Sequence, residues 1–570
     1  MIDLSHTINT CIQTIRELKR LWISIFITLL CGGVCAQNKT VKKYWIEFSD
    51  KKNTPYTVNV PHGFLSPRAI ERRMKQGIAI EASDLPLSPI YLDKVRQTGA
   101  QVQHVSKWLN AATIVADSIS IAAIELLDFV TKIEFVGRHF TKSTKQSGPP
   151  GQRLKNYAIP NPYHPYGYGR HQIQMVNGDI LHEVGYRGRG MLVAVMDGGF
   201  INSNHMPFFD SIRTEQRFLQ GKDFVDMDNE IFESATHGSE VLSVMASNLP
   251  GLFIGTAPDA HYVCLKTEDS RGEYLAEECH WVAGLEYADS LGVDVVNSSL
   301  GYTSFWDKSM NYSYEDMNGK VSRAARAADI AYEKGMIVVN SAGNSGNDPW
   351  SYIGAPADGN NILTVGATDF YGKKADFSSI GPTADGRLKP NVSAMGYGIM
   401  VARVRDYKVK LGYGTSFSSP LIAGMVASLW SAFPDKTNDE IIEAIELCGN
   451  QASRVDNKLG YGIPDFYKAY LLLNGSHETT YSIYPNPLTV FPKTSSNELE
   501  IIFLGKETEL SKLYVYDVLG KLVHEDEIDT RANIYNRHLL QLNSDWEAGF
   551  YVVQVKNGTH NFLQKTMLKR

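Results

Sequence analysis

The strongest constraint on the fold of this chain is an alternation of apolar runs with helical patterns that begins near Gln172. The runs are almost continuously apolar, which is typical of strands buried on both faces of a sheet. They lie at Leu192–Met196, Tyr262–Leu265, Val293–Val296, Ile337–Val339 and Ile362–Val365, with helical patterns such as Tyr274–Ser290 and Val321–Lys334 between them. Together they predict an α/β fold with a mainly parallel sheet flanked by helices. Functional residues of such a sheet gather at the carboxyl ends of its strands.

The residues before this region predict a separate, smaller unit. The expected elements are strands at Tyr44–Phe48, Val102–Val115 and Lys132–Val136 and helices at Ser66–Gln76, Tyr91–Thr98 and Ile119–Val130. Their alternation predicts an α+β domain over residues 37–140. Residues 141–171 are rich in Gly, Pro, Tyr and basic residues, which is the composition of a linker.

Beyond Asn474 the helical patterns stop and short alternating strands follow. They are expected at Leu499–Phe503, Leu513–Val518, His538–Leu542 and Gly549–Val555. This pattern predicts a small β-sandwich over residues 480–570, which leaves 172–474 for the parallel-sheet domain. A division into three folded parts suits a chain of 570 residues, because domains commonly hold roughly 150 residues.

The first 36 residues have the pattern of a secretory signal peptide. Lys19 and Arg20 precede an apolar stretch at Leu21–Leu30, and small residues follow up to Ala36. The alternative is an N-terminal membrane anchor, but a helix needs about 20 apolar residues to span a bilayer. We therefore expect cleavage after Ala36.

Cysteine content and charge exclude several other classes. Without the first 36 residues only Cys264, Cys279 and Cys448 are left. Three cysteines allow at most one disulfide, so we expect a fold stabilised by its core. A formal net charge of -6 and no long basic run give no footprint for nucleic acid.

Two candidate catalytic residues stand at the ends of expected elements. Asp197 follows the apolar run Val193–Met196 and precedes two glycines, so its carboxylate comes directly after a buried strand. His237 starts a helical pattern that continues through Leu242. Each has a simpler explanation, because an Asp here is often a turn or cap residue and a single His is usually structural.

A third candidate, Ser416, lies in the segment Gly414-Thr415-Ser416-Phe417 before a helix expected over Leu421–Phe433. Glycine permits a tight turn, and Ser416 would lie at the positive end of the helix. Pro420 is expected in the first turn, where a missing N–H costs little. The simpler alternative is a Ser or Thr that caps the helix.

Asn344 follows the expected strand Ile337–Val339 in a glycine-rich segment. Such an Asn is commonly a turn residue. Its amide can also donate to the oxyanion that forms during acyl transfer. The order Asp197, His237, Ser416 favours the catalytic role, since Asp before His before Ser is the order of one known class of triad.

With these motifs, the stretch from about Gln172 to Tyr470 resembles the subtilases, the serine peptidases of subtilisin type. Supporting segments are Gly255-Thr256-Ala257-Pro258-Asp259-Ala260, Val296-Asn297-Ser298-Ser299-Leu300-Gly301, Phe377-Ser378-Ser379-Ile380-Gly381-Pro382 and Gly460-Tyr461-Gly462. The resemblance implies a subtilisin-like fold and a secreted serine endopeptidase that works through an acyl-enzyme. It implies a triad of Asp197, His237 and Ser416, with an oxyanion hole formed by the Asn344 side chain and the Ser416 N–H.

The resemblance also implies a substrate site. Ser299, Leu300 and Gly301 would form an edge strand that pairs with the substrate backbone. Gly343 and Gly354 would belong to the same site, with Gly354 at the floor of the first side-chain pocket.

The chain departs from the subtilase pattern at two positions. Gly198 stands where the family usually has Ser or Thr, and Glu240 stands where a second His is often found. Neither position supplies the proton relay. Rival classes are a catalytically weak or inactive binding protein on this scaffold and a serine carboxyl peptidase of sedolisin type. The presence of all four polar groups disfavours the first, and His237 disfavours the second, which uses an acidic base.

Resemblance assigns roles to the terminal domains as well. Residues 37–140 resemble subtilase propeptides, so the chain is expected to be a zymogen whose own propeptide is an intramolecular inhibitor; the alternative is a permanent N-terminal domain. Residues 480–570 resemble the sorting domain of the bacterial type IX secretion machinery; the alternative is a carbohydrate- or protein-binding sandwich. We therefore expect export through the periplasm to the cell surface or beyond, with protein or peptide substrates. No cofactor is required, and a structural calcium stays open without assigned ligands.

Overall fold

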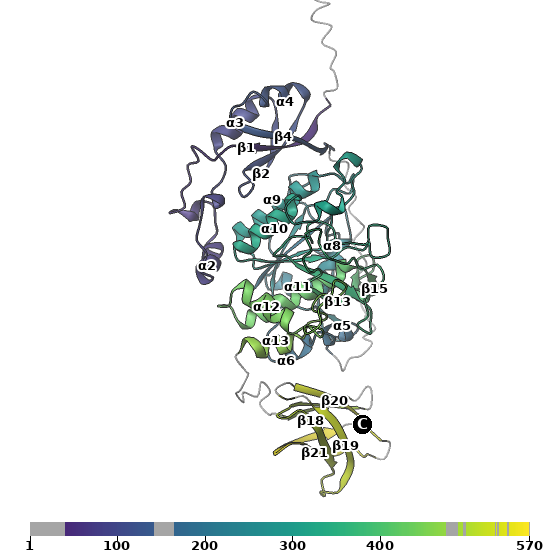
Figure 1. Cartoon of the computed structure of the whole chain (residues 1–570). Helices are drawn as coiled ribbons and strands as arrows, with labels where there is room; N and C mark the ends of the chain where they lie inside the picture. Colours follow the sequence, from purple (N-terminus) through teal and green to yellow (C-terminus); the bar gives the residue numbers. More distant parts are fainter. Residues whose placement is uncertain are drawn as a thin grey trace, which may run out of the picture.

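The computed structural model describes residues 40–141, 165–474, 488–493, 498–530, 532, 535–543 and 546–568. The predicted signal peptide at 1–36, most of the predicted linker at 141–171 and the start of the predicted C-terminal unit at 480–570 lie outside the described residues. Figure 1 shows an N-terminal part, a central part built on a large sheet and a C-terminal part made of strands.

The central part is built on a seven-stranded sheet with the order β13-β12-β11-β10-β5-β9-β6, and every neighbouring pair is parallel. Its strands are β5 (Leu192–Asp197), β6 (Lys222–Asp223), β9 (His261–Lys266), β10 (Val295–Ser298), β11 (Ile337–Ser341), β12 (Leu363–Thr368) and β13 (Val392–Met395). The predicted fold class, a mainly parallel sheet flanked by helices, is confirmed.

The remaining elements of the central part surround this sheet. The helices are α5 (Arg170–Gln174), α6 (Gly178–Glu183), α7 (Asp210–Thr214), α8 (His237–Ala246), α9 (Ala276–Leu291), α10 (Arg323–Glu333), α11 (Thr415–Ala432), α12 (Asn438–Leu447) and α13 (Phe466–Leu473). Two short hairpins join β7 (Asn248–Leu249) to β8 (Phe253–Ile254) and β14 (Tyr397–Arg403) to β15 (Lys408–Tyr413). None of the helices among the described residues is long and apolar enough to cross a membrane.

Alternate residues of strand β5 enter two different cores. Val193 and Val195 pack with side chains of α8 and α11, whereas Leu192, Ala194 and Met196 pack with side chains of α9 and α10. Each fully buried aliphatic side chain contributes about 1.5–3 kcal/mol relative to an exposed one. The strand is continuously apolar because helices cover both faces of the sheet.

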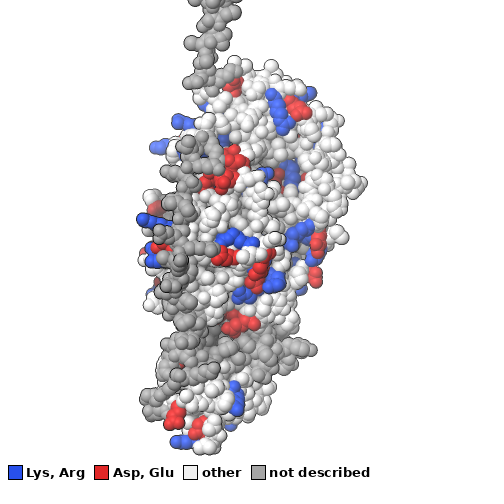
Figure 2. Space-filling view, turned by 180° about the vertical axis from the view of Figure 1, so that it is seen from behind, with Lys and Arg blue, Asp and Glu red and all other residues white. Residues whose placement is uncertain are grey.

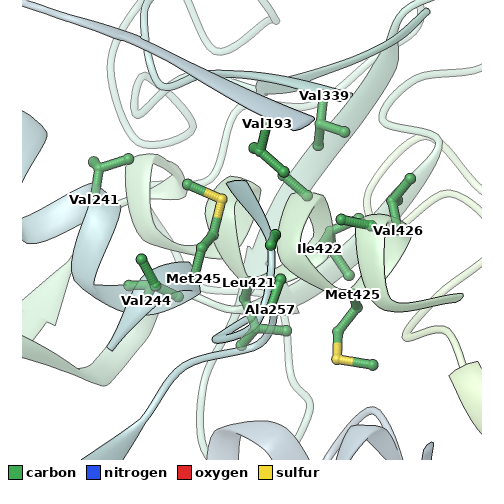
Figure 3. Close-up of a cluster of buried hydrophobic side chains, with 14 of the residues drawn as sticks. Val193, Val241, Val244, Met245, Ala257, Val339, Leu421, Ile422, Met425 and Val426 are labelled. Atoms are coloured by element: carbon green, nitrogen blue, oxygen red, sulfur yellow. The ribbon is translucent and has the colours of Figure 1, made fainter. Parts of the chain in front are cut away.

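Figure 3 shows part of the first core. Val193 of β5 and Val339 of β11 lie on the sheet side, and Leu421 and Ile422 of α11 lie across from them. Met245 of α8 lies in the same cluster. Helices α8 and α11 are therefore anchored by apolar contacts behind their N-terminal ends, which holds those ends at the edge of the sheet.

Helix α11 begins at Thr415, six residues earlier than the sequence pattern predicted. Pro420 consequently lies in the second turn of the helix and not in the first, which corrects the prediction. A proline at 420 cannot donate to the carbonyl of Ser416, four residues earlier. That carbonyl instead accepts a hydrogen bond from the hydroxyl of Ser299 at 2.8 Å.

The N-terminal part has one antiparallel sheet with the order β2-β3-β1-β4. Its elements are β1 (Lys42–Phe48), α2 (Pro67–Lys75), α3 (Pro89–Gln97), β2 (Gln101–Ser106), β3 (Ala111–Ala116), α4 (Ser118–Ile124) and β4 (Val130–Arg138). The strand predicted over Val102–Val115 is thus wrong in extent, because it is a hairpin of two strands. Its turn has neither Gly nor Pro, and Asn110 supplies the left-handed backbone with a φ of 49°.

This N-terminal part packs on α9 (Figure 1), and Arg323 of α10 forms an ion pair with Glu134 of β4 at 2.7 Å. Asp289 of α9 is fully buried in the interface, and it forms ion pairs with three cationic side chains of the N-terminal part. Arg72 lies 2.6 Å, Arg73 2.9 Å and Lys107 2.8 Å from its carboxylate oxygens. Burial raises the pKa of Asp289, but these three charges outweigh that effect and hold the pKa below its ordinary value.

Glu286, one helical turn before Asp289, binds the tip of the β2–β3 hairpin. Its carboxylate accepts hydrogen bonds from the Ser106 hydroxyl at 2.5 Å and from the backbone N–H groups of Lys107 and Trp108 at 2.7 and 3.2 Å. Burial nevertheless raises the pKa of Glu286 to about 7. The hairpin and the helix are thus joined by hydrogen bonds to one carboxylate.

The C-terminal part consists of two antiparallel sheets, β16-β17-β20 and β19-β18-β21-β22. Its strands are β16 (Leu488–Lys493), β17 (Glu498–Leu504), β18 (Glu509–Tyr516), β19 (Leu522–Thr530), β20 (Tyr535–Gln541), β21 (Gly549–Asn557) and β22 (His560–Leu568). Side chains from both sheets share one core, as in a β-sandwich. The four predicted strands are present, and β16, β19 and β22 are additional.

The three cysteines outside the first 36 residues, Cys264, Cys279 and Cys448, are all free and buried. Apolar packing therefore stabilises the described parts without a disulfide among these three. On the face shown in Figure 2, Lys and Arg alternate with Asp and Glu over the described surface. The described residues of this face therefore show no extended patch of one charge.

Candidate active site

The predicted site residues gather at the carboxyl ends of three neighbouring strands. Asp197 is the last residue of β5, Ser299 directly follows β10, and Asn344 lies three residues beyond β11. Strands β5, β10 and β11 lie side by side in the sheet. Ser416 reaches the same edge as the second residue of α11.

Asp197 and His237 are in direct contact. The Nδ1 of His237 lies 2.8 and 3.0 Å from the two carboxylate oxygens of Asp197. Gly238 makes this contact possible, because a Cβ there would lie only 2.5 Å from the carbonyl oxygen of Gly199 and 2.9 Å from the Cβ of Asp197. The first turn of α8 can therefore approach the end of β5 only with glycine at this position.

The charge of Asp197 sets the protonation of His237. Asp197 is 1% exposed, so its carboxylate acts at short range in a medium of low dielectric constant. Its charge raises the pKa of His237 above the ordinary value, while burial of the ring opposes this rise. Because Nδ1 faces the carboxylate, the other ring nitrogen, Nε2, is the one left to accept a proton.

Ser416 lies at the N-terminal end of α11, two residues after Gly414. The backbone conformation of Gly414 is one that only glycine adopts readily. Gly414 has a φ of 142°. The Ser416 hydroxyl donates to the carbonyl of Ser299 at 3.4 Å and forms no hydrogen bond with His237 in this structure. The His237 ring lies near the next residue, with its centroid 5.7 Å from that of Phe417. The structure thus brings the three groups to one edge with the serine turned toward β10.

The amide of Asn344 has a defined orientation. Its Oδ1 accepts hydrogen bonds from the backbone N–H of Thr415 at 2.9 Å and from the Thr415 hydroxyl at 3.0 Å. Because the N–H can only donate, the amide oxygen must face Thr415 and Nδ2 must point the other way. This Nδ2 lies 3.5 Å from the position of a Cβ built on Gly414, next to the serine.

One cleft of about 170 Å³ contains all the predicted substrate-site and oxyanion residues. It is lined by Ser299, Leu300, Gly301, Gly343, Asn344, Gly354 and Ser416, together with Thr303, Ser341, Ala342, Ser345, Trp350, Tyr352 and Ser379. No charged side chain lines it. A Cβ on Gly354 would lie 2.7 Å from the methyl group of Thr303, another residue of the cleft lining, so a larger residue there would clash with Thr303.

Three residues that lie beside this cleft were missed in the sequence, namely Thr415, Tyr302 and Glu268. Thr415 orients Asn344, and its hydroxyl also accepts from the Gly343 N–H at 3.2 Å. Tyr302 continues the segment after Gly301, and its hydroxyl donates to Glu268 at 2.7 Å. The Gly-Thr-Ser motif could have drawn attention to Thr415, but no local pattern links Tyr302 to Glu268.

The two departures from the subtilase pattern have simple surroundings. A Cβ on Gly198 would make ordinary contacts of 3.5 and 3.7 Å with the Cβ atoms of Glu268 and Ala235. Glu240 forms an ion pair with Lys410 at 2.7 Å. Neither residue displaces the contact between Asp197 and His237.

The described residues contain one compact group of possible metal ligands, Asp223, Asp226 and Glu233. The ammonium group of Lys266 already lies among them, 2.9 Å from Asp223, 3.5 Å from Asp226 and 3.4 Å from Glu233. This group therefore does not fit an additional calcium ion. Structural calcium stays a prediction without assigned ligands.

A sheet covered on both faces, with Asp, His and Ser gathered at its carboxyl edge, is the arrangement of a serine-type endopeptidase. Comparison with known families agrees: residues 188–462 match the Subtilase family, and this domain belongs to it. Residues 43–150 match the Peptidase S8 propeptide domain, Bacteroidota, and residues 482–569 match the Secretion system C-terminal sorting domain. The chain is therefore a secreted serine protease made as a zymogen, exported by type IX secretion to the cell surface or outside.

Two subtilisins of known sequence support this assignment. Subtilisin NAT from Bacillus subtilis subsp. natto is 27% identical over 378 residues, which cover 65% of this chain and 82% of the relative. Subtilisin DY from Bacillus licheniformis is 29% identical over 280 residues, covering 49% and 88%. A solved structure, the MycP3 protease from the type VII (ESX-3) secretion system, has a TM-score of 0.42 at 20% identity, covering 54% and 89%.

Proposed function

We propose that Asp197, His237 and Ser416 hydrolyse peptide bonds through an acyl-enzyme intermediate. The observation that carries this proposal is the contact between the Asp197 carboxylate and His237 Nδ1, at the strand end beside the cleft that contains Ser416. A buried carboxylate that fixes the ring in this orientation leaves Nε2 to accept a proton from a serine hydroxyl.

The reaction follows from these positions. Neutral His237 takes the proton of Ser416 as the hydroxyl oxygen attacks the scissile carbonyl. Rotation of the serine side chain away from the Ser299 carbonyl brings the hydroxyl to the ring. The buried charge of Asp197 stabilises the imidazolium, which then gives its proton to the leaving amine. Water, activated by the same imidazole, releases the acyl group from Ser416.

The developing oxyanion is stabilised by the Nδ2 of Asn344 and the backbone N–H of Ser416. Both lie at the edge of the same cleft, and the N–H belongs to the first turn of α11, where backbone donors lack partners within the helix. Thr415 holds the amide of Asn344 in place before the substrate arrives, so little reorganisation is needed during the reaction.

Replacing Asn344 by alanine is expected to lower kcat by about 10²–10³-fold, because one of two oxyanion donors is lost. KM should change little, since the donor faces the transition state more than the bound substrate. Steady-state kinetics on a peptide substrate measure both constants. The matched control is Asn360→Ala, at an exposed position, and a rise in KM with an unchanged kcat would contradict the assigned role.

Ser299, Leu300 and Gly301 supply the backbone for an extended substrate. They line the cleft at the end of β10, and pairing through backbone groups accepts many sequences. Gly343 and Gly354 border the pocket for the residue before the scissile bond. Because no charged side chain lines this pocket, it accepts uncharged side chains.

A serine-reactive phosphonate tests the proposal directly. An activated nucleophile is phosphonylated, whereas ordinary serines are inert. Mass spectrometry of the digested protein is expected to find one modified peptide, with the label on Ser416. Labelling of a different serine, or no labelling of an enzyme that cleaves peptides, would overturn the assignment.

The N-terminal domain is proposed to be the chain's intramolecular inhibitor. Its last strand leads toward the active-site loops: Phe140, just beyond β4, lies beside Tyr274 with ring centroids 6.2 Å apart. Ion pairs to Asp289 and hydrogen bonds to Glu286 hold it on the catalytic domain. The C-terminal sandwich is proposed to engage the type IX machinery.

Asp289→Asn is expected to weaken the hold of the N-terminal domain at least about 100-fold. The change leaves Arg72 and Lys107 buried without an ion-pair partner, whereas Arg73 keeps Asp84 at 2.9 Å, and breaking a buried ion pair costs about 3–5 kcal/mol. The precursor of residues 37–570 is first cleaved in its linker and then diluted. The measurement is the protein concentration below which the N-terminal domain dissociates and peptidase activity appears. Asp93→Asn, at an exposed residue of α3, is the control; an unchanged dilution curve would refute the role of Asp289.

A further inference from the structure

An ion pair joins the helix that carries His237 to the hairpin that leads to Ser416. Glu240 lies one turn after His237 on α8, and its carboxylate lies 2.7 Å from the ammonium group of Lys410 on β15. Strand β15 pairs with β14 and ends directly before Gly414, where the turn into α11 begins. The pair therefore connects the element of the proposed base with the element that precedes the proposed nucleophile.

A second polar contact joins the same two elements. Ser243 lies one further turn along α8, and its hydroxyl accepts a hydrogen bond from the Ala402 N–H of β14 at 2.9 Å. The same hydroxyl donates to the Glu240 carbonyl at 2.6 Å. Because residues three apart lie on the same face of a helix, Glu240 and Ser243 form one polar edge of α8 against the hairpin.

The end of the hairpin also reaches the His237 ring through one aromatic side chain. A Cβ on Gly412 of β15 would lie 3.0 Å from the ring of Phe417, so glycine lets this ring pack on the strand. The Phe417 ring centroid in turn lies 5.7 Å from that of His237. Since β15 ends only three residues before Ser416, a displacement of the hairpin would move both the nucleophile and the ring beside His237.

The burial of Glu240 makes a cationic partner necessary. Glu240 is 8% exposed, and a buried carboxylate without a cation is costly when ionised. The Lys410 side chain, which is 37% exposed, supplies the charge from the hairpin. Because subtilases often carry a second His at position 240, the acidic residue is a feature of this chain and not of the family pattern.

Three charged groups face the His237 ring from the elements packed around it. They are Asp197 at the end of β5, Glu240 on the same helix and Lys410 of β15. The charge of Asp197 has the largest effect and raises the pKa of His237, while burial lowers it. Glu240 raises this pKa as well, and Lys410 lowers it. The effects of the ion pair are therefore opposite, and the intact pair changes the ring less than either charge alone.

We propose, on the basis of the peptidase function proposed above, that Glu240 and Lys410 are positioning residues of the catalytic centre. Their ion pair holds the β14–β15 hairpin, and with it the turn of Ser416, on the helix that carries His237. Because the two charges are opposite, the pair does so without adding a net charge beside the imidazole. Neither residue lines the cleft, so both act through the serine and the histidine.

The acidic limb of the kcat/KM profile, measured on processed enzyme with an uncharged peptide, tests the role of the two charges. In Glu240→Gln the charge of Lys410 is left alone, so the pKa of His237 falls and the limb moves at least about 0.5 pH unit lower. In Lys410→Gln the charge of Glu240 is left alone, so the limb moves at least about 0.5 pH unit higher. In the double variant both charges are absent, and the limb is expected within about 0.2 pH unit of the wild type.

The plateau kcat tests positioning separately from charge. All three variants lack the ion pair, so each is expected to lose at least about threefold in plateau kcat, and the loss persists in the double variant. Titration with the serine-reactive phosphonate corrects kcat for enzyme that has not folded. Lys408→Gln, at an exposed position on the same strand, is the matched control and is expected to keep the wild-type limb and plateau.

Two results would overturn this role of the pair. The first is an acidic limb that stays at the wild-type pH in both single variants or moves in the same direction in both. The second is a wild-type plateau kcat in the double variant. If Asp197→Asn moves the limb and Glu240→Gln does not, only the role of the pair fails. Peptide cleavage that persists in Ser416→Ala would instead refute the proposed function.

Discussion

Ser416→Ala is expected to lower kcat by about 10⁶-fold and to leave the chain of residues 37–570 uncut. Loss of the serine removes the covalent route altogether, and in the subtilisin series this change costs about 10⁶. The oxyanion donors and the cleft are untouched, so a small residual rate over water is expected. The measurements are kcat on a peptide and the size of the purified precursor over time.

The two readouts distinguish chemistry from maturation. If the wild-type chain cleaves its own linker, Ser416→Ala loses peptide turnover and self-processing together. If another protease matures the chain, the variant loses only peptide turnover. The control is Ser453→Ala, at an exposed serine outside the cleft, which is expected to behave like wild type. A purified alanine variant that still processes itself at the wild-type rate would contradict the assignment of Ser416.

Sequence patterns located the catalytic edge because its signals are local. An apolar run followed by Asp197, or a glycine before Ser416, places a polar group at the end of an element whatever the rest of the chain does. The direction of the sheet then brings β5, β10 and β11 together. For this reason the parallel sheet and the gathering of Asp197, His237, Asn344 and Ser416 could be foreseen.

What the sequence did not reveal depends on contacts between distant residues. The hydrogen bond from Tyr302 to Glu268 and the orientation of Asn344 by Thr415 join residues from different loops. The burial of Asp289 by the N-terminal domain has the same origin. The early start of α11 was missed because Pro420 suggested a helix start, although the Ser299 hydroxyl satisfies the carbonyl that the proline leaves without a donor.

Asp197→Asn is expected to reduce kcat/KM by about 10⁴-fold and to move the acidic limb of the pH profile to lower pH. The amide no longer holds the imidazole in the reactive tautomer, which accounts for the loss of rate. Catalysis needs neutral His237, and in the wild type the charge of Asp197 raises the pKa of this ring. Wild-type activity is therefore lost as the pH falls through a value above about 6.5.

Removing the charge leaves burial as the main influence on His237, and burial lowers its pKa. The variant should therefore keep its small residual activity at a pH where the wild type has already lost a part of its own. Profiles of kcat/KM against pH for both enzymes, with Asp435→Asn at an exposed position as the control, measure the shift. The pKa of the His237 ring must change when the charge of Asp197 is removed, because the two groups are in contact. An acidic limb at the same pH in wild type and Asp197→Asn would therefore show that a group other than His237 controls the reaction.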